Sequence, residues 1–505
     1  MGQTTLILMI LTVISKIFGF VRESVMAAYI GAGELKSVYT TATSFPTLLT
    51  NIVVVGIASS YIPVYNKVLN ETGEEQAEEF TSNLINTLMI FGLFIYILVF
   101  IFAEPISKIL SPKLDGEWLE LTATYTRIMM FAVFAFLYAS VIRGYLNIKG
   151  NFVDPLITGL ILNIIIIIST ITTGKIKNPL ILIFGTLIAN VVQYIRFPFV
   201  ARKVGFKYQR KLDVSDKYIK YILAMVIPLV LSSAADQLSI LIDNSMASAF
   251  FGVSSVSKIF YAKSMLNFIL GVVTLSIATV TFPDIAKLGQ SGDLEQMRSK
   301  IGSSIVFSML LVIPATLGMM ALAKPIIQLA FERRAFTAND TEIVSNLLVS
   351  YGPYIIFASL IKIIANGFYS VGDSITPVII VLIQQVINVI LNIMLVRFFD
   401  IDGLGYATSI STAIGSLILL LAFSNKFGGF ENKKDIISLF KILFSSIIMI
   451  IVARVTFKVI NLSLIASLFI SILIAGIIYL LLIKLMKIGA VEVMFESMKS
   501  KFIKK

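Results

Sequence analysis

The sequence contains no cysteine and no histidine, and only 14% of its 505 residues are charged. The first two absences exclude disulfides, thiolate nucleophiles, zinc sites built from Cys or His, and a histidine general base. The phosphate-binding pattern GxxxxGK[ST] is also missing, so no ATPase site of that type is present. We therefore predict that the protein is not an enzyme, and that any transport depends on an ion gradient, the membrane potential or the substrate gradient.

Long apolar runs fill the chain instead. Hydrophobic residues make up 57% of it and the mean hydropathy is +0.93, whereas a soluble domain is about one quarter charged. A spanning helix needs about 20 apolar residues. We predict an all-α integral membrane protein with about fourteen transmembrane helices. The candidate spans are residues 5–30, 36–64, 84–104, 117–148, 153–173, 178–200, 216–250, 255–283, 302–330, 340–371, 375–398, 403–424, 436–459 and 462–487.

The charge balance sets the predicted orientation. The formal net charge of +12 could indicate nucleic acid, but in a membrane protein Lys and Arg gather in cytoplasmic loops that face anionic lipid. With the N-terminus inside, inner loops hold roughly 24 Lys and Arg and outer loops roughly 10, largely because of the basic segment 201–220. We expect cytoplasmic termini, contact with membrane lipids and no nucleic-acid partner.

An internal repeat appears at an offset of 220 residues. The segment Ala103–Ile106 (AEPI) recurs as Ala323–Ile326 (AKPI), and Pro63 recurs as Pro283. Six spans separate equivalent positions, so the two copies have the same orientation, as in transporters with a central cavity between two lobes. We predict two pseudo-symmetric six-helix lobes, residues 1–212 and 213–428, followed by two extra helices and a basic tail in 429–505.

Charged side chains lie within the first predicted span. Such charges cost about 2.5–3.5 kcal/mol at a helix centre, so each one requires a reason. Lys16 and Glu23 are seven residues apart and share a helix face, and Arg22 projects about a third of a turn away. One interpretation is a local Lys16–Glu23 pair with Arg22 reaching the interface. The other is a basic wall of a wet cavity, suited to an anionic headgroup.

A second polar set lies in the later spans. Asp243 in the seventh span could pair with Lys263, or could join Asn388, Asn392 and Thr408 in a Na⁺ site, because carboxylate, amide and hydroxyl oxygens are hard ligands. The alternative for the last three is ordinary hydrogen bonding between helices. We predict no other cofactor.

Several motifs resemble one family. The run Ser15–Glu23 (SKIFGFVRE) is similar to the S-R-x-x-G-x-x-R-[DE] opening of the MurJ/MviN lipid II flippases, in the multidrug/oligosaccharidyl-lipid/polysaccharide exporter superfamily. The resemblance continues through Gly31–Gly33 (GAG), and the run Phe331–Thr341 (FERRAFTANDT) is similar to the family segment F-x-R-G-A-F-x-x-x-D-T.

The resemblance implies a basic central cavity that alternates between inward-open and outward-open states. Its substrate would be a polyprenyl-pyrophosphate-linked peptidoglycan precursor, in a bacterial cytoplasmic membrane. Lys16 and Arg22 fall on family arginines that face the pyrophosphate. Where the family often has other charged residues, this chain has uncharged ones. The predicted substrate-binding residues are Lys16, Arg22, Glu23, Ser37, Asn51, Lys263 and Ser264.

We therefore predict a flippase that carries lipid II from the inner to the outer leaflet as a monomer. The alternatives are a flippase for another polyprenyl-pyrophosphate-linked glycan and a cation-coupled drug antiporter of the same superfamily. A glycosyltransferase or polymerase acting within the membrane would need catalytic carboxylates near a large outer loop, and the predicted outer loops are short. A membrane scaffold would give no reason for the charges in the spans.

Overall fold

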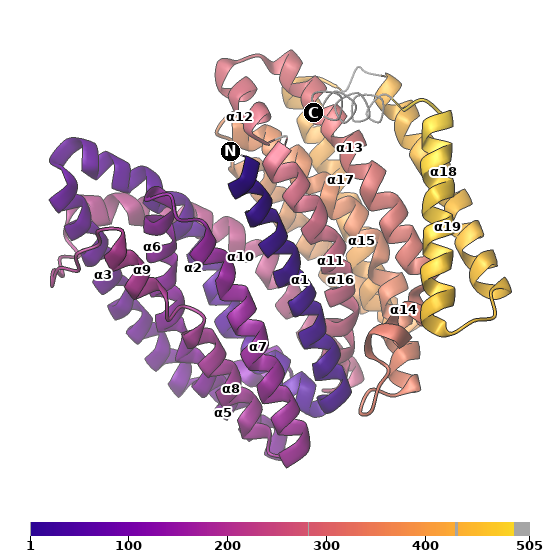
Figure 1. The fold of residues 1–505 in the computed structure, drawn as a ribbon, viewed down its shortest axis with the longest axis horizontal. Coiled ribbons are helices and arrows are strands. Elements are labelled where there is room, and N and C mark those ends of the chain that lie inside the picture. Colours follow the sequence, from indigo (N-terminus) through magenta and orange to yellow (C-terminus); the bar gives the residue numbers. More distant parts are fainter. Residues whose placement is uncertain (1, 281, 430–432, 489–505) are drawn as a thin grey trace. The chain divides into compact units, whose positions relative to one another are not determined.

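Every regular element in the computed structural model is an α-helix (Figure 1). The structure describes residues 2–280, 282–429 and 433–488. Within these, side chains are described except at 2–10, 50, 52–55, 58–59, 227–236, 238–239, 272–280, 282–283 and 433. The basic tail that contributed to the predicted orientation, from Lys499 onward, lies outside the described residues.

By its internal contacts the chain divides into two units. The first comprises residues 1–257 with 333–337, and the second 258–332 with 338–505. Helices lying in the first unit are α1 (Gly2–Ile30), α2 (Glu34–Thr72), α3 (Glu74–Ile101), α4 (Ala103–Leu110), α5 (Gly116–Met130), α6 (Ala132–Ile148), α7 (Val153–Ile176), α8 (Pro179–Val192), α9 (Phe197–Lys203) and α10 (Lys217–Phe251).

The remaining helices belong to the second unit, apart from the first three residues of α11. They are α11 (Ser255–Val280), α12 (Phe282–Ser291), α13 (Leu294–Ala321), α14 (Ala323–Phe331), α15 (Ala338–Ser370), α16 (Ile375–Phe399), α17 (Asp402–Phe427), α18 (Lys433–Val459) and α19 (Leu464–Leu485). The units are groups defined by packing, whereas the predicted lobes follow the repeat. The boundary at residue 212 therefore stays a prediction.

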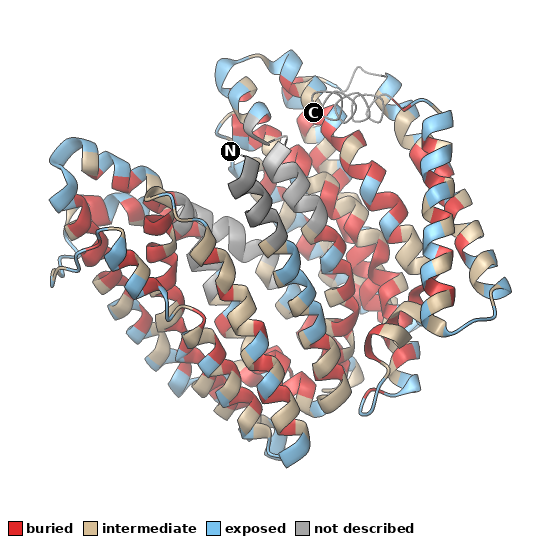
Figure 2. Cartoon of the chain, in the orientation of Figure 1, coloured by how far each residue is buried: buried red, intermediate tan, exposed pale blue. Residues whose placement is uncertain are grey.

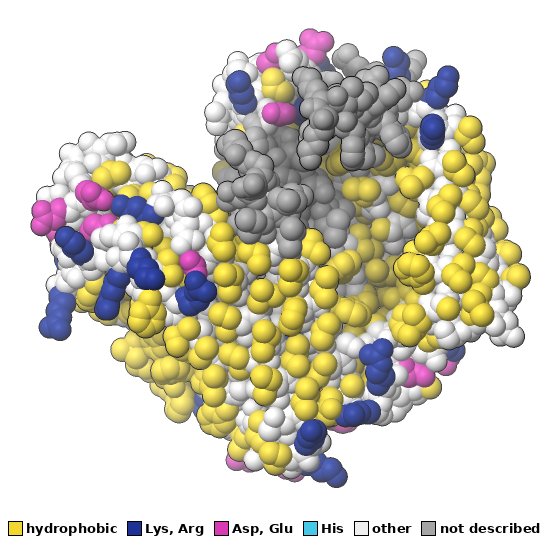
Figure 3. Space-filling model, viewed as in Figure 1, with side chains coloured by type: hydrophobic (Ala, Val, Ile, Leu, Met, Phe, Trp, Pro, Cys, Tyr) yellow, Lys and Arg dark blue, Asp and Glu magenta, His cyan; other side chains and the backbone are white. Residues whose placement is uncertain are grey.

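The predicted all-helical membrane fold is confirmed. Among the described residues, 10 helical stretches are long and apolar enough to cross a membrane, with α5–α6 and α8–α9 each counted as one. Four further long helices, α1, α2, α10 and α11, have 26 to 39 residues. Together these stretches overlap the fourteen predicted spans. Figure 3 shows hydrophobic side chains over α18 and α19, as expected of faces in contact with lipid.

Two of the predicted spans were placed wrongly. Spans 84–104 and 302–330 are instead α3 and α13, each ending earlier and followed by a short helix. Proline explains both ends: its ring clashes with the carbonyl four residues back, and Pro105 and Pro325 lie four residues after Ile101 and Ala321, the last residues of these helices. Both bounds of α3 recur in α13 shifted by 220 residues, from 74 to 294 and from 101 to 321.

Polar side chains of α3 fix the basic segment that follows α9 to the first unit. The Asn83 amide donates to the Asp213 carbonyl at 2.9 Å and accepts from the Asp213 amide at 2.8 Å. The Glu78 carboxylate accepts from the Lys207 amide at 3.1 Å and from the Tyr145 hydroxyl at 2.6 Å. These bonds place the start of α3, the end of α6 and the basic segment at one end of the unit. Figure 2 shows how buried residues gather where the helices face one another.

Candidate substrate-binding site

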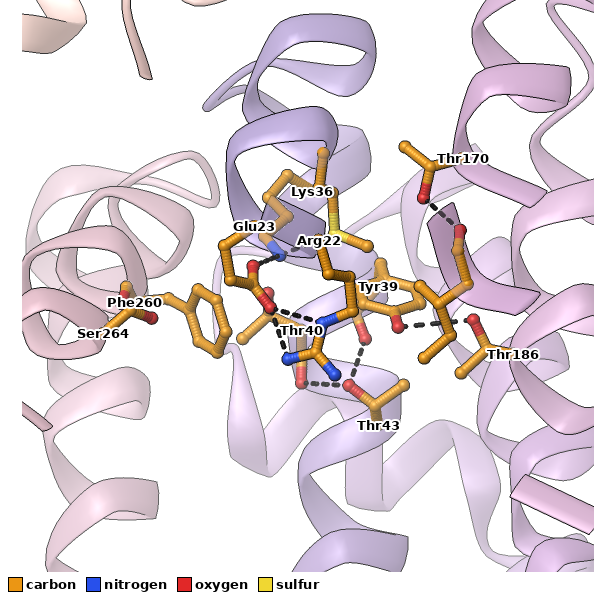
Figure 4. Close-up of polar contacts among 12 residues, drawn as sticks. Arg22, Glu23, Lys36, Tyr39, Thr40, Thr43, Thr170, Thr186, Phe260 and Ser264 are labelled. Atoms are coloured by element: carbon orange, nitrogen blue, oxygen red, sulfur yellow. Dashed lines mark hydrogen bonds and ion pairs between the residues drawn. The ribbon is translucent and has the colours of Figure 1, made fainter. Parts of the chain in front are cut away.

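Three charged side chains form a compact cluster at the C-terminal half of α1 (Figure 4). The Glu23 carboxylate accepts two hydrogen bonds from Arg22 on one oxygen, from Nε at 3.0 Å and from Nη2 at 2.6 Å. Its other oxygen lies 3.1 Å from the Lys36 ammonium. Both Glu23 and Lys36 are buried. We call Arg22, Glu23 and Lys36 the charged triad, and its formal charge of +1 is held inside the protein.

Lys36 reaches Glu23 because the chain reverses sharply after α1. Gly31 has a φ of +80°, which favours glycine, and α2 begins three residues later, so that Lys36 in its first turn lies 3.1 Å from Glu23. The Lys36 Nζ also lies 2.8 Å from the Met26 sulfur and 5.3 Å from the centre of the Tyr39 ring. The Tyr39 hydroxyl accepts a hydrogen bond from Thr186 of α8 at 3.3 Å, so a third helix bounds the triad.

The triad corrects one interpretation and adds a residue. The carboxylate of Glu23 is bound by Arg22 and Lys36, so the local Lys16–Glu23 pair is wrong. Spacing along one helix predicts that Lys16 and Glu23 share a face. It cannot predict a contact between residues on opposite sides of a turn. Lys36 was not predicted; the only signal available was a lone lysine just inside a span that follows a glycine turn.

Arg22 keeps binding capacity in this arrangement. Among the described residues only Glu23 accepts hydrogen bonds from it, and a guanidinium has five N–H donors. Its side chain is 25% exposed, against 0% for Lys36. Arg22 can therefore bind a further anionic oxygen, while Lys36 holds the carboxylate in place.

Lys16 lies elsewhere, in a pocket of about 470 Å³ on α1, α6 and α7. Arg143 and Asn147 of α6 and Phe152 line the same pocket. The Arg143 guanidinium lies 3.5 Å from the carbonyl of Pro155 at the start of α7. The structure thus brings Lys16 together with Arg143 and not with Arg22.

The other predicted substrate residues of the first unit have internal partners. The Ser37 hydroxyl is buried and accepts from the Ser257 amide at 3.0 Å. These two serines are 220 residues apart, so equivalent positions of the repeat bond to each other. Asn51 is exposed, and its amide lies 3.5 Å from the Gln237 carbonyl oxygen on α10.

Two predicted substrate residues belong to the second unit. The Lys263 ammonium lies 4.7 Å from the centre of the Tyr351 ring, a cation–π geometry. The Ser264 hydroxyl donates to the Phe260 carbonyl one turn earlier at 2.7 Å. These contacts describe the second unit by itself, and the shared role of Lys263 with the residues of α1 stays a prediction.

The predicted Na⁺ residues are only partly brought together. Asn388 donates to Thr408 across α16 and α17 at 3.2 Å, and Asn392 donates to the Asn388 carbonyl oxygen at 3.2 Å. Asp243 is buried in the first unit. The described residues contain no group of three acidic side chains suited to a metal. The oxygens of Asn388 and Thr408 are of the right type for Na⁺, but the Thr408 hydroxyl accepts from Asn388 across two helices and the Asn388 oxygen accepts from Asn392 within α16. The predicted hydrogen bonding between helices is therefore present, and the Na⁺ site stays a prediction.

A bundle of membrane-spanning helices with a charged triad where its first two helices meet is typical of a polytopic membrane transporter. The family model of the lipid II flippase MurJ matches residues 26–475. The chain belongs to this family, which is a family of transporters and not of enzymes.

Individual relatives agree. The chain is 28% identical over 429 residues to a probable lipid II flippase MurJ from Rickettsia prowazekii, covering 84% of each chain. It is similar to a solved lipid II flippase MurJ in an inward closed conformation, with a TM-score of 0.81, 25% identity and coverage of 94% of this chain and 98% of that one. An inward-facing multidrug resistance MATE transporter shares the fold, with a TM-score of 0.71, 14% identity and coverage of 83% and 96%.

Proposed function

We propose that this protein moves lipid II across the cytoplasmic membrane of a bacterium, with Arg22 of the charged triad binding the diphosphate. The observation that carries the proposal is a net positive cluster, formed by the first span and the start of α2, in a chain that belongs to the lipid II flippase family. A buried cation is expensive unless it has an anionic partner. A substrate with a diphosphate supplies such a partner once it arrives.

The triad suggests how the exchange occurs. Glu23 neutralises Arg22 when no substrate is bound. An incoming phosphate oxygen accepts hydrogen bonds from the Arg22 N–H groups that Glu23 leaves free, and Lys36 holds Glu23 in place. Arginine suits this step because its fork can bind two phosphate oxygens at once, whereas lysine offers a single point charge. The lipid tail stays in the membrane, and access alternates between the two sides.

The test is reconstitution of the full chain in proteoliposomes that contain labelled lipid II. The measurement is the fraction of label that becomes accessible on the opposite leaflet. We expect transport by the unaltered protein, loss of most of it in Arg22→Gln, and only partial recovery in Arg22→Lys.

Arg127→Gln is the matched control. Arg127 is an arginine of the same unit whose Nε donates to the Phe100 carbonyl at 3.1 Å, away from the triad. This variant should transport normally. Full transport by a folded Arg22→Gln protein would refute the role of Arg22. Failure of the unaltered protein to move lipid II, while it moves another polyprenyl-diphosphate glycan, would refute the substrate.

A further inference from the structure

The pocket that contains Lys16 is separate from the charged triad. Lys16 and Arg22 are six residues apart on the continuous helix α1, which corresponds to about 9 Å along the axis and about a third of a turn around it. The two side chains therefore leave the helix in different directions, and each meets a different second cation: Arg143 near Lys16, and Lys36 beside the triad carboxylate.

The charges of this pocket are not balanced by the protein. Among the described residues, neither Lys16 nor Arg143 has a carboxylate within ion-pair distance. The acid nearest in sequence to the lining residue Pro155 is Asp154, which pairs with Arg196 at 2.8 Å and accepts from Asn151 at 2.8 Å. Lys16 is exposed and Arg143 is half-buried, so both cations are accessible to an anion that enters the pocket.

The size and lining of the pocket fit a small anionic group on an apolar chain. Its volume of about 470 Å³ falls within the ~300–1,000 Å³ typical of ligand sites. Asn147 and Ser15 add polar lining, while Phe152 and Leu156 add apolar surface. The helices α1 and α7 pack closely beside the pocket, because a Cβ on Gly159 would lie 2.5 Å from the Ser15 hydroxyl oxygen. A headgroup bearing phosphate has the matching chemistry.

The pocket lies at the basic end of the first unit. Arg143 is five residues before the end of α6, about 8 Å along the helix, and the ion pair between Lys149 and Glu74 joins that end of α6 to the start of α3. The basic segment is fixed to the same part of α3. With the predicted orientation, this is the cytoplasmic half, from which an inner-leaflet substrate arrives.

We propose that Lys16 and Arg143 form a loading site, which binds the diphosphate of the lipid-linked substrate before Arg22 does. This inference rests on the proposed function and assigns Arg143 as a binding residue. The substrate then passes about 9 Å outward along α1, from one pair of cations to the triad. Transport thus uses two phosphate positions at different depths.

The experiment measures binding of farnesyl diphosphate to the detergent-purified full chain by native mass spectrometry. Arg143→Gln and Lys16→Gln should each weaken binding about ten-fold, the effect of losing one charge-assisted hydrogen bond. Arg143→Lys should restore much of it. Arg22→Gln should fail in transport but keep the part of the binding that depends on Lys16 and Arg143, and Arg127→Gln should change neither binding nor transport.

Competition identifies the source of the phosphate. Inorganic pyrophosphate should displace the probe, and phosphatidylglycerol in excess should not. Equal displacement by phosphatidylglycerol would assign the pocket to ordinary lipid and overturn the loading role. Normal binding and transport by Arg143→Gln, together with loss of transport in Arg22→Gln, would overturn this inference and leave the proposed function standing. Loss of transport in neither variant would count against both.

Discussion

Removing the carboxylate of the charged triad should destabilise the first unit strongly. In Glu23→Gln, Arg22 and Lys36 keep their charges and lose their shared partner. At the observed separations of 2.6 and 3.1 Å, each attraction is about 5–6 kcal/mol at an effective dielectric constant of about 20, before desolvation is subtracted. Breaking a buried pair by removing one partner costs about 3–5 kcal/mol, and we expect a loss in that range.

A double substitution separates two costs of Glu23→Gln: the lost attraction to Glu23, and the buried charge of Lys36 that is left without a partner. Lys36→Met leaves Glu23 paired with Arg22, so it should cost less than Glu23→Gln. Combining Glu23→Gln with Lys36→Met removes the fully buried cation as well, and leaves only Arg22, whose side chain is partly exposed. The double variant should be more stable than Glu23→Gln, with a coupling energy of about 2–3 kcal/mol.

The assay is thermal unfolding of the purified full chain, followed by fluorescence-detected size exclusion. A loss of about 3 kcal/mol should lower the apparent Tm by about 3 °C, because the entropy of unfolding grows with the length of the chain. Glu104→Gln is the matched control, because Glu104 is an exposed acid of the same unit. The reasoning fails if Glu23→Gln unfolds at the same temperature as the unaltered protein, or if the double variant is no more stable than Glu23→Gln.

Three further predictions concern other parts of the molecule. Gly31→Ala should lower the free energy of unfolding by at least about 1 kcal/mol. The φ of Gly31 is +80°, and a Cβ there would lie 2.7 Å from the Ala335 carbonyl oxygen. Gly33→Ala is the control: its Cβ would meet nothing within 4 Å, so this variant should unfold as the unaltered protein does. Burial alone would raise the pKa of Asp373, but hydrogen bonds from Lys426 and Thr376 hold it at about 2, below the ordinary 3.8. The stability contributed by ionised Asp373 is therefore complete above about pH 4 and is lost toward pH 2. The difference in Tm between the unaltered protein and Asp373→Asn should shrink over that interval, and a constant difference would contradict this. If Na⁺ binds at Asn388, NaCl should raise the Tm more than choline chloride does, and Asn388→Ala should abolish the difference; equal effects of both salts would exclude the site.

Much of the architecture follows from the sequence. Span length is set by bilayer thickness, so runs of apolar residues located the long helices. The prolines at 105 and 325 held the signal for the ends of α3 and α13, because a ring clash acts over four residues of one chain. The cost of a buried charge likewise marked Lys16 and Arg22 as functional candidates before any contact was known.

Partners across helices were decided only by the tertiary structure. Helical periodicity relates residues three, four or seven apart on one helix, so it placed Lys16 beside Glu23 and could not place Lys36 there. The Ala335 amide donates to the Ala28 carbonyl at 3.1 Å across more than 300 residues, which joins two motifs that the sequence shows separately. Arg143 shares a pocket with Lys16 for the same reason: α7 packs against α1, and only the packing of helices sets which side chains line one pocket.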